Sequence, residues 1–243
     1  MKFAFVFPGQ GSQSVGMMQA FADSPGVREV FATASEALKQ DLWKLVAEGP
    51  AEELNSTVNT QPIMLTAGYA IYRAWRDAGR AEPACAAGAS LGAYTGPLPA
   101  GALASHHAVP LVRLRAQAMQ EAVPMGEGAM AAILGMEDDA VNAACREAAQ
   151  GQVVEPVNFN APAQVVIAGH KPAVERGMAA AKARGAKRAV MLPVSAPFHS
   201  SLLQPAADRL SAHLGKIRVN APRIPVVNNV DVATECDPQR IKD

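Results

Sequence analysis

The sequence predicts an α/β protein in which a small unit of strands and helices is inserted into a larger α/β domain. Three observations support this fold class. Residues 2–7 form a short apolar run that ends at Pro8 and Gly9, which is typical of a buried strand entering a tight loop. Residues 129–192 alternate between strand and helix patterns. Residues 224–230 have the composition of a buried parallel strand.

The segment before residue 125 is mostly helical. Helical patterns dominate to about residue 79, and the best of them is 61–78, where Pro62 suits the first turn. Residues 83–89 form a weaker strand candidate because they are rich in Ala rather than in β-branched residues. A second strong helix is expected over residues 108–123.

The inserted unit is expected at residues 126–194, between two parts of the larger domain at 1–125 and 195–243. Its expected elements are strand 129–134, helix 137–150, strand 153–158, a turn at 160–162, strand 164–168, helix 172–184 and strand 187–192. This β-α-β-β-α-β order is of the ferredoxin-like type.

Composition excludes several classes of protein. The 243 residues carry 22 basic and 22 acidic side chains, and this zero net charge argues against a nucleic-acid binder. The three cysteines lie far apart and show neither a disulfide nor a metal-binding pattern. Apolar runs are too short for a signal peptide or a membrane span. We therefore expect a soluble, cytoplasmic protein without a metal.

Ser90 is the candidate nucleophile, because Gly88-Ala89-Ser90-Leu91-Gly92 has the form G-x-S-x-G. In this motif a strand precedes the serine and a helix follows it, so that the hydroxyl is exposed on a strained turn. An ordinary serine in a glycine-rich turn would give the same pattern.

His199 is the candidate base among five histidines. It lies where a strand and turn give way to a helix, and the order Ser before His matches serine hydrolases built on α/β sheets. We expect surface roles for His106 and His107, in a polar loop, and for His213. For His170, which precedes a helix, we expect a capping or surface role.

Arg115 lies at the centre of the apolar face of the helix predicted at 108–123. A buried arginine needs an anion to match its donors. That anion is either an internal Asp or Glu or the charged group of a ligand. A side chain that snorkels from the edge of the core is the third possibility.

The loop of Gly9, Gln10 and Gly11 follows the first strand, and its glycines would let backbone N–H groups approach a ligand. It lacks the phosphate-binding signatures. It is either a plain turn or a source of oxyanion donors.

These segments together resemble the malonyl-CoA:acyl carrier protein transacylases of fatty-acid synthesis, which are related to polyketide-synthase acyltransferase domains. The resemblance covers essentially the whole chain. The segments that carry it are 7–13 (FPGQGSQ), 88–92 (GASLG), 111–120 (LVRLRAQAMQ), 158–162 (NFNAP), 194–202 (VSAPFHSSL) and 224–230 (IPVVNNV).

The resemblance implies a role for each matched residue. Ser90 would be the nucleophile and His199 its base, the backbone N–H groups of Gln10 and Leu91 would form the oxyanion hole, and Arg115 would bind the carboxylate of malonate. The implied fold is an α/β-hydrolase-like domain with a ferredoxin-like insert. The implied partners are malonyl-CoA and acyl carrier protein. No cofactor is implied beyond the CoA thioester, which is a substrate. We expect the protein to be a monomer.

The family's carrier proteins are acidic, so a local basic patch is expected even at zero net charge. Candidate residues are Lys182, Arg184, Lys187 and Arg188. A solvated basic face would look the same in sequence.

The sequence departs from the family pattern at three places. Ala89 and Ala93 stand where the family usually has His and Glu, and Pro97 and Pro99 interrupt a stretch that is helical in relatives. Relatives also continue beyond the position of Asp243, and a backbone carbonyl of their C-terminal part orients the catalytic histidine. We therefore expect a shortened chain with weakened activity.

Three rival functions remain open. One is the malonyl transferase subunit of a malonate decarboxylase, and another is a serine esterase that uses water as the acceptor. The third is a non-catalytic homologue that binds acyl carrier protein or CoA.

Overall fold

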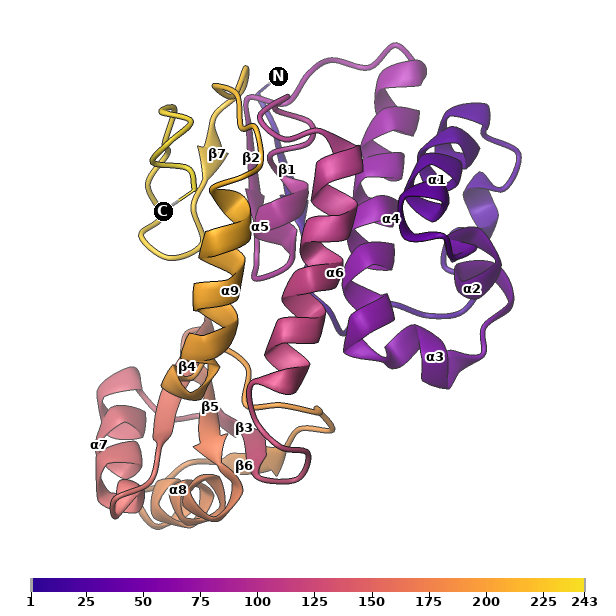
Figure 1. The fold of residues 1–243 in the computed structure, drawn as a ribbon. Helices are drawn as coiled ribbons and strands as arrows, with labels where there is room; N and C mark the ends of the chain where they lie inside the picture. Colours follow the sequence, from indigo (N-terminus) through magenta and orange to yellow (C-terminus); the bar gives the residue numbers. More distant parts are fainter. Residues whose placement is uncertain (1, 243) are drawn as a thin grey trace. The chain divides into compact units, whose positions relative to one another are not determined.

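The computed structural model describes residues 2–242, which divide into two compact units (Figure 1). The first unit comprises the residues up to Gln117 and those from Leu210 onward, and the second comprises Ala118–Arg209. The first holds a parallel sheet and the second an antiparallel sheet, so the predicted α/β class is confirmed.

The first unit contains a three-stranded parallel sheet of order β1-β2-β7 and most of the helices. Its elements are β1 (Ala4–Phe7), η1 (Gln19–Phe21), α1 (Pro25–Leu38), α2 (Leu42–Glu48), α3 (Ala51–Asn55), α4 (Thr57–Asp77), β2 (Cys85–Gly88), α5 (Gly92–Thr95), α6 (Ser105–Glu121) and β7 (Val226–Val227). The last turn of α6 belongs to the second unit, and α9 (Gln204–Leu214) ends in the first.

Aromatic packing holds the edge strand β1 against helix α4. The Phe5 ring meets the rings of Tyr72 and Trp75 edge-on, with centroids 5.5 and 5.8 Å apart, and Phe7 is buried. The central strand β2 has neighbours on both sides and a fully buried Ala86. Small residues therefore suffice there, which explains why an Ala-rich run forms the middle of the sheet.

The structure corrects two boundaries in this unit. Helix α4 begins at Thr57, so Pro62 is inside the helix; the expected start at residue 61 was wrong because Ser56, with extended backbone, precedes the first turn. The strand expected over residues 224–230 has only two paired residues. The chain turns back after Val227, which bridges Thr234, and Val230 is exposed.

The second unit contains a four-stranded antiparallel sheet of order β4-β5-β3-β6. Its elements are β3 (Gly128–Leu134), α7 (Asp138–Ala149), β4 (Val154–Ala161), β5 (Gln164–His170), α8 (Lys171–Ala183), β6 (Arg188–Met191) and η2 (Ser201–Leu203). Helices α7 and α8 pack on one face of this sheet through a buried apolar cluster that includes Ile133, Val141, Ile167 and Val174.

The order of elements in this unit is the one expected, but the turn between β4 and β5 is tighter. Strand β4 continues to Ala161, and only Pro162 and Ala163 connect it to β5. Ala163 has φ +57°, a left-handed conformation that lets two residues reverse the chain. Placing the turn at residues 160–162 was therefore early.

Candidate active site

Ser90 lies on a sharp turn between a strand and a helix of the first unit. Strand β2 ends at Gly88 and α5 begins at Gly92, so three residues make the connection. The Ser90 backbone has φ +51°, in the left-handed region that residues other than glycine seldom occupy. A serine held in this strained conformation between strand and helix is typical of a nucleophile.

The two glycines of the motif are required by close packing. A Cβ atom on Gly88 would overlap the backbone carbonyl of Gly92, and a Cβ on Gly92 would overlap the backbone carbonyl of Phe7 in β1. Only glycine fits at either position without moving the backbone. The G-x-S-x-G spacing is therefore explained by how tightly the turn is folded against the sheet.

Arg115 extends from α6 to the serine hydroxyl. Its Nη2 donates a hydrogen bond to Ser90 Oγ at 3.2 Å, and its Nη1 donates to Gln61 Oε1 at 2.6 Å. The guanidinium carbon lies 5.2 Å from the centroid of the Tyr94 ring, within cation–π range. Helices α4 and α6, which supply Gln61 and Arg115, lie side by side in Figure 1.

The Arg115 guanidinium is buried without a carboxylate. Arg115 is only 8% exposed, and it takes part in no ion pair among residues 2–242. The described part of the chain therefore gives no support to an internal salt bridge. Burial lowers the pKa of Arg115 from its usual value, and Tyr94 acts in the opposite direction. An arginine remains protonated in proteins, so the site carries a positive charge.

The backbone N–H groups of Gln10 and Leu91 are the candidate oxyanion donors. A Cβ on Gly9 would lie 3.2 Å from the Ala89 carbonyl oxygen, so the loop after β1 approaches the serine turn closely. Within residues 2–242, neither Gln10 nor Leu91 donates its backbone N–H to another backbone or side-chain oxygen. Leu91 directly follows the serine, which is the usual position of one oxyanion donor.

Sequence reasoning missed three side chains around this turn. Gln61 and Tyr94 contact Arg115, and Asn229 Oδ1 accepts a hydrogen bond from the Ser90 N–H at 2.7 Å. The sequence held one indication that Gln61 is a site residue, namely a polar residue directly before the apolar run 62–65. The only signal for Asn229 in the sequence is its place near the end of the strand expected at 224–230.

His199 lies in the second unit, in the segment between β6 and η2, and its backbone is also left-handed, with φ +67°. The turn around it is held on both sides. The Ser200 hydroxyl donates to the Pro197 carbonyl at 2.8 Å, and Ser201 donates from its N–H and its hydroxyl to the Glu155 carboxylate at 2.8 and 2.9 Å. Strained conformations of this kind cluster at functional positions.

The other four histidines lie in helices or directly before one. The rings of His106 and His107 lie 4.2 Å apart in the first turn of α6, so placing them in a loop was wrong. The side chain of His170 does not cap α8; its Nδ1 accepts a hydrogen bond from the Val153 N–H at 3.0 Å. His213 lies in the last turn of α9.

Two of the departures from the family pattern lie in or just after the serine turn. Ala89 is exposed and Ala93 is half-buried. Because both are alanines, neither has a polar side-chain group to offer Ser90. Helix α5 ends at Thr95, before Pro97 and Pro99, and the chain continues in turns. The two prolines therefore lie beyond the end of this helix and do not interrupt it.

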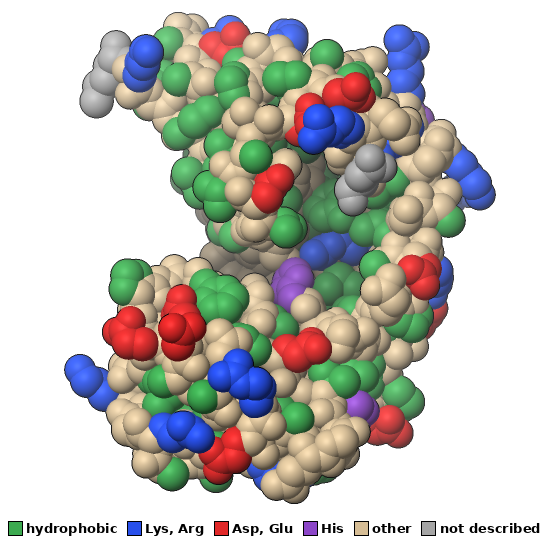
Figure 2. Space-filling model, turned by 90° about the vertical axis from the view of Figure 1, so that its left-hand side faces the viewer, with side chains coloured by type: hydrophobic (Ala, Val, Ile, Leu, Met, Phe, Trp, Pro, Cys, Tyr) green, Lys and Arg blue, Asp and Glu red, His purple; other side chains and the backbone are tan. Residues whose placement is uncertain are grey.

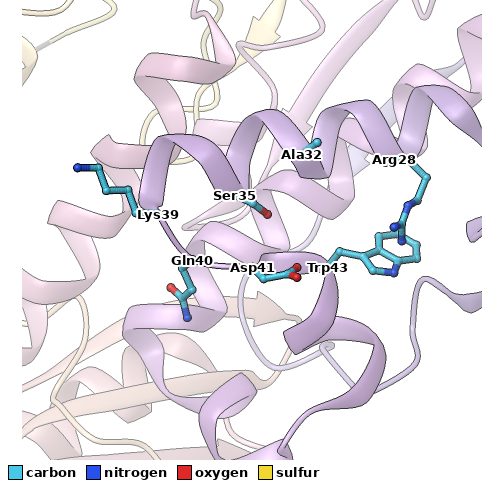
Figure 3. Close-up of a pocket in the computed structure, with 7 residues that line it drawn as sticks. All are labelled: Arg28, Ala32, Ser35, Lys39, Gln40, Asp41 and Trp43. Carbon is cyan, nitrogen blue, oxygen red and sulfur yellow. The ribbon is translucent and has the colours of Figure 1, made fainter.

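A groove of about 390 Å³ between α1 and α2 contains none of the predicted site residues (Figure 3). The Arg28 guanidinium lies 4.1 Å from the centroid of the Trp43 ring. Asp41 caps α2 by accepting from the Lys44 N–H at 2.8 Å, and Ser35 accepts from the Leu42 N–H at 3.0 Å. These side chains are used to connect the two helices.

The basic residues considered for partner binding are all exposed. Arg184 is paired with Glu147 at 2.7 Å, whereas no ion pair described for residues 2–242 includes Lys182, Lys187 or Arg188. On the face drawn in Figure 2, basic and acidic side chains are interspersed.

A serine on a strained turn with a buried arginine beside it is the arrangement expected of a candidate acyl-transfer site. The chain belongs to the acyl transferase domain family, which matches residues 4–241. The resemblance read from the sequence motifs is thereby confirmed.

Relatives narrow this class further. The malonyl CoA-acyl carrier protein transacylase of Escherichia coli strain K12 is 59% identical over 243 residues, which are 100% of this chain and 79% of that protein. The crystal structure of the acyl-carrier-protein S-malonyltransferase from Burkholderia pseudomallei is 64% identical, with a TM-score of 0.98 over 100% of this chain and 79% of that one. A structure described as a type II PKS acyl-carrier protein in complex with its malonyl-transacylase is 51% identical, with a TM-score of 0.97 over 100% of this chain and 79% of that chain.

Two features are absent from residues 2–242. No helix there is both long and apolar enough to cross a membrane. Nor do three or more His, Cys, Asp or Glu side chains of that range gather as a metal site would require.

Proposed function

We propose that this protein transfers a malonyl group from malonyl-CoA to the phosphopantetheine thiol of an acyl carrier protein, as a step of fatty-acid synthesis. The single observation that carries the proposal is the pairing of Ser90 with Arg115. A buried guanidinium that makes no ion pair within residues 2–242 lies 3.2 Å from the hydroxyl of a serine on a strained turn. The names of the relatives agree with this substrate and acceptor.

The chemistry of malonate fits this arrangement. A malonyl thioester carries its free carboxylate one methylene beyond the carbonyl that the nucleophile attacks. An acyl group on Ser90 would therefore bring that carboxylate close to Arg115, which is already in contact with the serine oxygen. A bidentate pair between guanidinium and carboxylate is among the stronger charge-assisted contacts in proteins.

The proposed reaction has two half-reactions through a covalent acyl-serine. Ser90 Oγ attacks the thioester carbonyl while His199 takes the hydroxyl proton, and the N–H groups of Gln10 and Leu91 stabilise the oxyanion. The C–S bond then breaks, and His199 returns the proton to the sulfur of CoA. In the second half-reaction the carrier thiol gives its proton to His199 and attacks the ester carbonyl. The bond between the acyl carbon and Ser90 Oγ then breaks, and His199 returns the proton to Ser90 Oγ.

No cofactor other than the CoA thioester itself takes part in the proposed reaction. The three cysteines are free thiols in the described structure, which suits the reducing cytoplasm in which we propose that the protein acts. That it acts as a monomer stays a prediction from the sequence.

We further propose that the chain forms an α/β-hydrolase-like domain with a ferredoxin-like insert, which the sequence predicts at 1–125 and 195–243 and at 126–194. The two compact units of the structure divide between Gln117 and Ala118 and between Arg209 and Leu210. Two observations support the proposed fold. The parallel sheet carries the serine between a strand and a helix, as in hydrolases of that class. The β-α-β-β-α-β order with an antiparallel sheet suits the insert.

Intact-mass spectrometry tests the covalent step. After incubation with malonyl-CoA, the protein is expected to carry one malonyl group, and Ser90→Ala is expected to carry none. Ser211→Ala, at an exposed position on α9, is the matched control and should be acylated like the wild type. An adduct that persists in Ser90→Ala would overturn the assignment of the nucleophile, and a wild type without any adduct would favour a binding function.

The same assay separates transfer from hydrolysis and tests the base. Adding an acyl carrier protein should move the malonyl group to its thiol, whereas an esterase would release malonate to water at the same rate with or without the carrier. His199→Ala should slow acylation of Ser90 by about 10²–10⁴-fold, the usual contribution of a general base. An unchanged acylation rate would remove His199 from the mechanism.

A further inference from the structure

Gln61 is the direct partner of Arg115, and nothing in the proposed reaction requires it. It lies on α4 and is completely buried, with an exposed fraction of 0%. Its Oε1 accepts a hydrogen bond from Arg115 Nη1 at 2.6 Å. Buried polar side chains lie where their hydrogen bonds are satisfied. The position of Gln61 is therefore explained by its hydrogen bond to the guanidinium.

The contacts of the guanidinium divide it into two ends. Nη1 is held by Gln61, while Nη2 faces the serine and donates to Ser90 Oγ at 3.2 Å. The Tyr94 ring, 5.2 Å from the guanidinium carbon, limits movement on a third side. Gln61 therefore holds the end of the fork that is remote from the nucleophile and leaves the other end facing the reacting group.

The chemistry of the partner matters as much as its position. An amide oxygen satisfies a buried N–H donor but carries no net charge, so it leaves the positive charge of Arg115 uncompensated. A carboxylate at the same place would satisfy the same donor and also cancel that charge. Because an uncompensated buried charge is unfavourable, the resting site gains from any ligand that brings an anion.

We propose that Gln61 is the positioning residue that keeps Arg115 both oriented and uncompensated, so that the site selects acyl groups with a free carboxylate over neutral acyl groups. This inference rests on the proposed function, because it concerns selection among CoA thioesters that acylate Ser90. It assigns selectivity to a residue that need not touch the substrate and acts through the charge state of its neighbour.

The decisive variant is Gln61→Glu, which keeps the length and shape of the side chain and adds the charge. Its carboxylate would pair with Arg115 and compete with the substrate carboxylate. We expect kcat/KM for malonyl-CoA to fall by about 10²-fold, as for the loss of a buried charged contact. Acetyl-CoA has no carboxylate to be excluded, so its kcat/KM should change by less than about fivefold, and the malonyl/acetyl ratio should fall at least about twentyfold.

Gln61→Met separates orientation from charge. It fills a similar volume and leaves Arg115 charged but without its acceptor. We expect KM for malonyl-CoA to rise by about tenfold with kcat changed less, and the malonyl/acetyl ratio to stay above that of Gln61→Glu. The matched control is Gln40→Glu. The Gln40 amide oxygen accepts a hydrogen bond from Arg113, which lies on α6 like Arg115. The malonyl/acetyl ratio of Gln40→Glu should equal that of the wild type.

Two results would overturn the inference. One is an unchanged malonyl/acetyl ratio in a folded Gln61→Glu protein. The other, which decides the matter if Gln61→Glu does not fold in a thermal melt, is a Gln61→Met protein with wild-type KM for malonyl-CoA. These results differ from a failure of the proposed function, in which the wild type itself would not be acylated by malonyl-CoA.

Discussion

Two arginines on the same helix, Arg113 and Arg115, have opposite environments. They are two residues apart on α6 and so point in different directions, and each donates to the amide oxygen of a glutamine. Arg113 is half-buried and binds Gln40 and Asn59, and its buried Nε has no partner within residues 2–242. Arg115 is buried and contacts the hydroxyl of Ser90.

The difference shows what separates a structural arginine from one that binds a ligand. Burial lowers the pKa of both guanidinium groups, so the titration behaviour alone would not distinguish them. The neighbours do. The two Nη groups of Arg113 donate hydrogen bonds to Asn59 on α4 and to Gln40 in the turn before α2. Gln40 also lines the groove of Figure 3. One end of Arg115 faces a reactive hydroxyl instead.

The largest expected effect is on kcat/KM, when Arg115 and Arg113 are each replaced with alanine in separate variants. Arg115→Ala should lower kcat/KM for malonyl-CoA by about two to three powers of ten, because loss of one partner of a buried charged pair costs about 3–5 kcal/mol. Arg113→Ala should change it by less than about threefold, since the hydrogen bonds of Arg113 go to Asn59 and Gln40, away from Ser90. Steady-state transfer to acyl carrier protein measures both. Equal losses in the two variants would erase the distinction.

A smaller effect is expected from replacing each arginine with lysine. Arg115→Lys should recover less than about a tenth of the lost malonyl transfer, because a point charge cannot reproduce a planar fork that binds a carboxylate at two donors. Arg113→Lys should transfer malonyl groups at the wild-type rate. Full activity in Arg115→Lys would show that only the charge matters, and that the orientation given by Gln61 is unnecessary.

The smallest effect concerns stability and should reverse the ranking of the two sites. Arg113→Ala removes hydrogen bonds to Gln40 and Asn59 and should lower the free energy of unfolding by about 1–3 kcal/mol. Arg115→Ala also removes an uncompensated buried charge, so we expect a smaller loss there. Urea unfolding of both variants gives the comparison. A larger loss for Arg115→Ala would identify that residue as structural.

The sequence predicted the serine turn and the arginine face because both are encoded locally. Gly88, Ser90 and Gly92 lie within five residues, and the apolar face around Arg115 can be read from a single helix. The partners Gln61 and Asn229 were missed because they are 54 and 139 residues away from the groups they bind. Contacts over such distances depend on how helices and loops pack, which periodicity does not describe.

The errors in the fold have a more local cause. The strand expected at 224–230 has the right composition, but the chain reverses after Val227 to bridge Thr234. The start of α4 was misplaced because Pro62 was read as belonging to the first turn, whereas the helix accommodates it further inside. Composition predicted that these elements exist, and only the local backbone determined where they begin and end.

The malonyl/acetyl ratio of kcat/KM in Arg115→Ala, with Arg113→Ala alongside, tests the central claim most directly. If Arg115 is the group that receives the substrate carboxylate, malonyl transfer falls by about two to three powers of ten while acetyl transfer falls much less or rises, and the ratio drops accordingly. Arg113→Ala leaves the ratio where it is in the wild type. A ratio that does not move in Arg115→Ala, with both substrates falling together, would contradict the account and make Arg115 a structural residue.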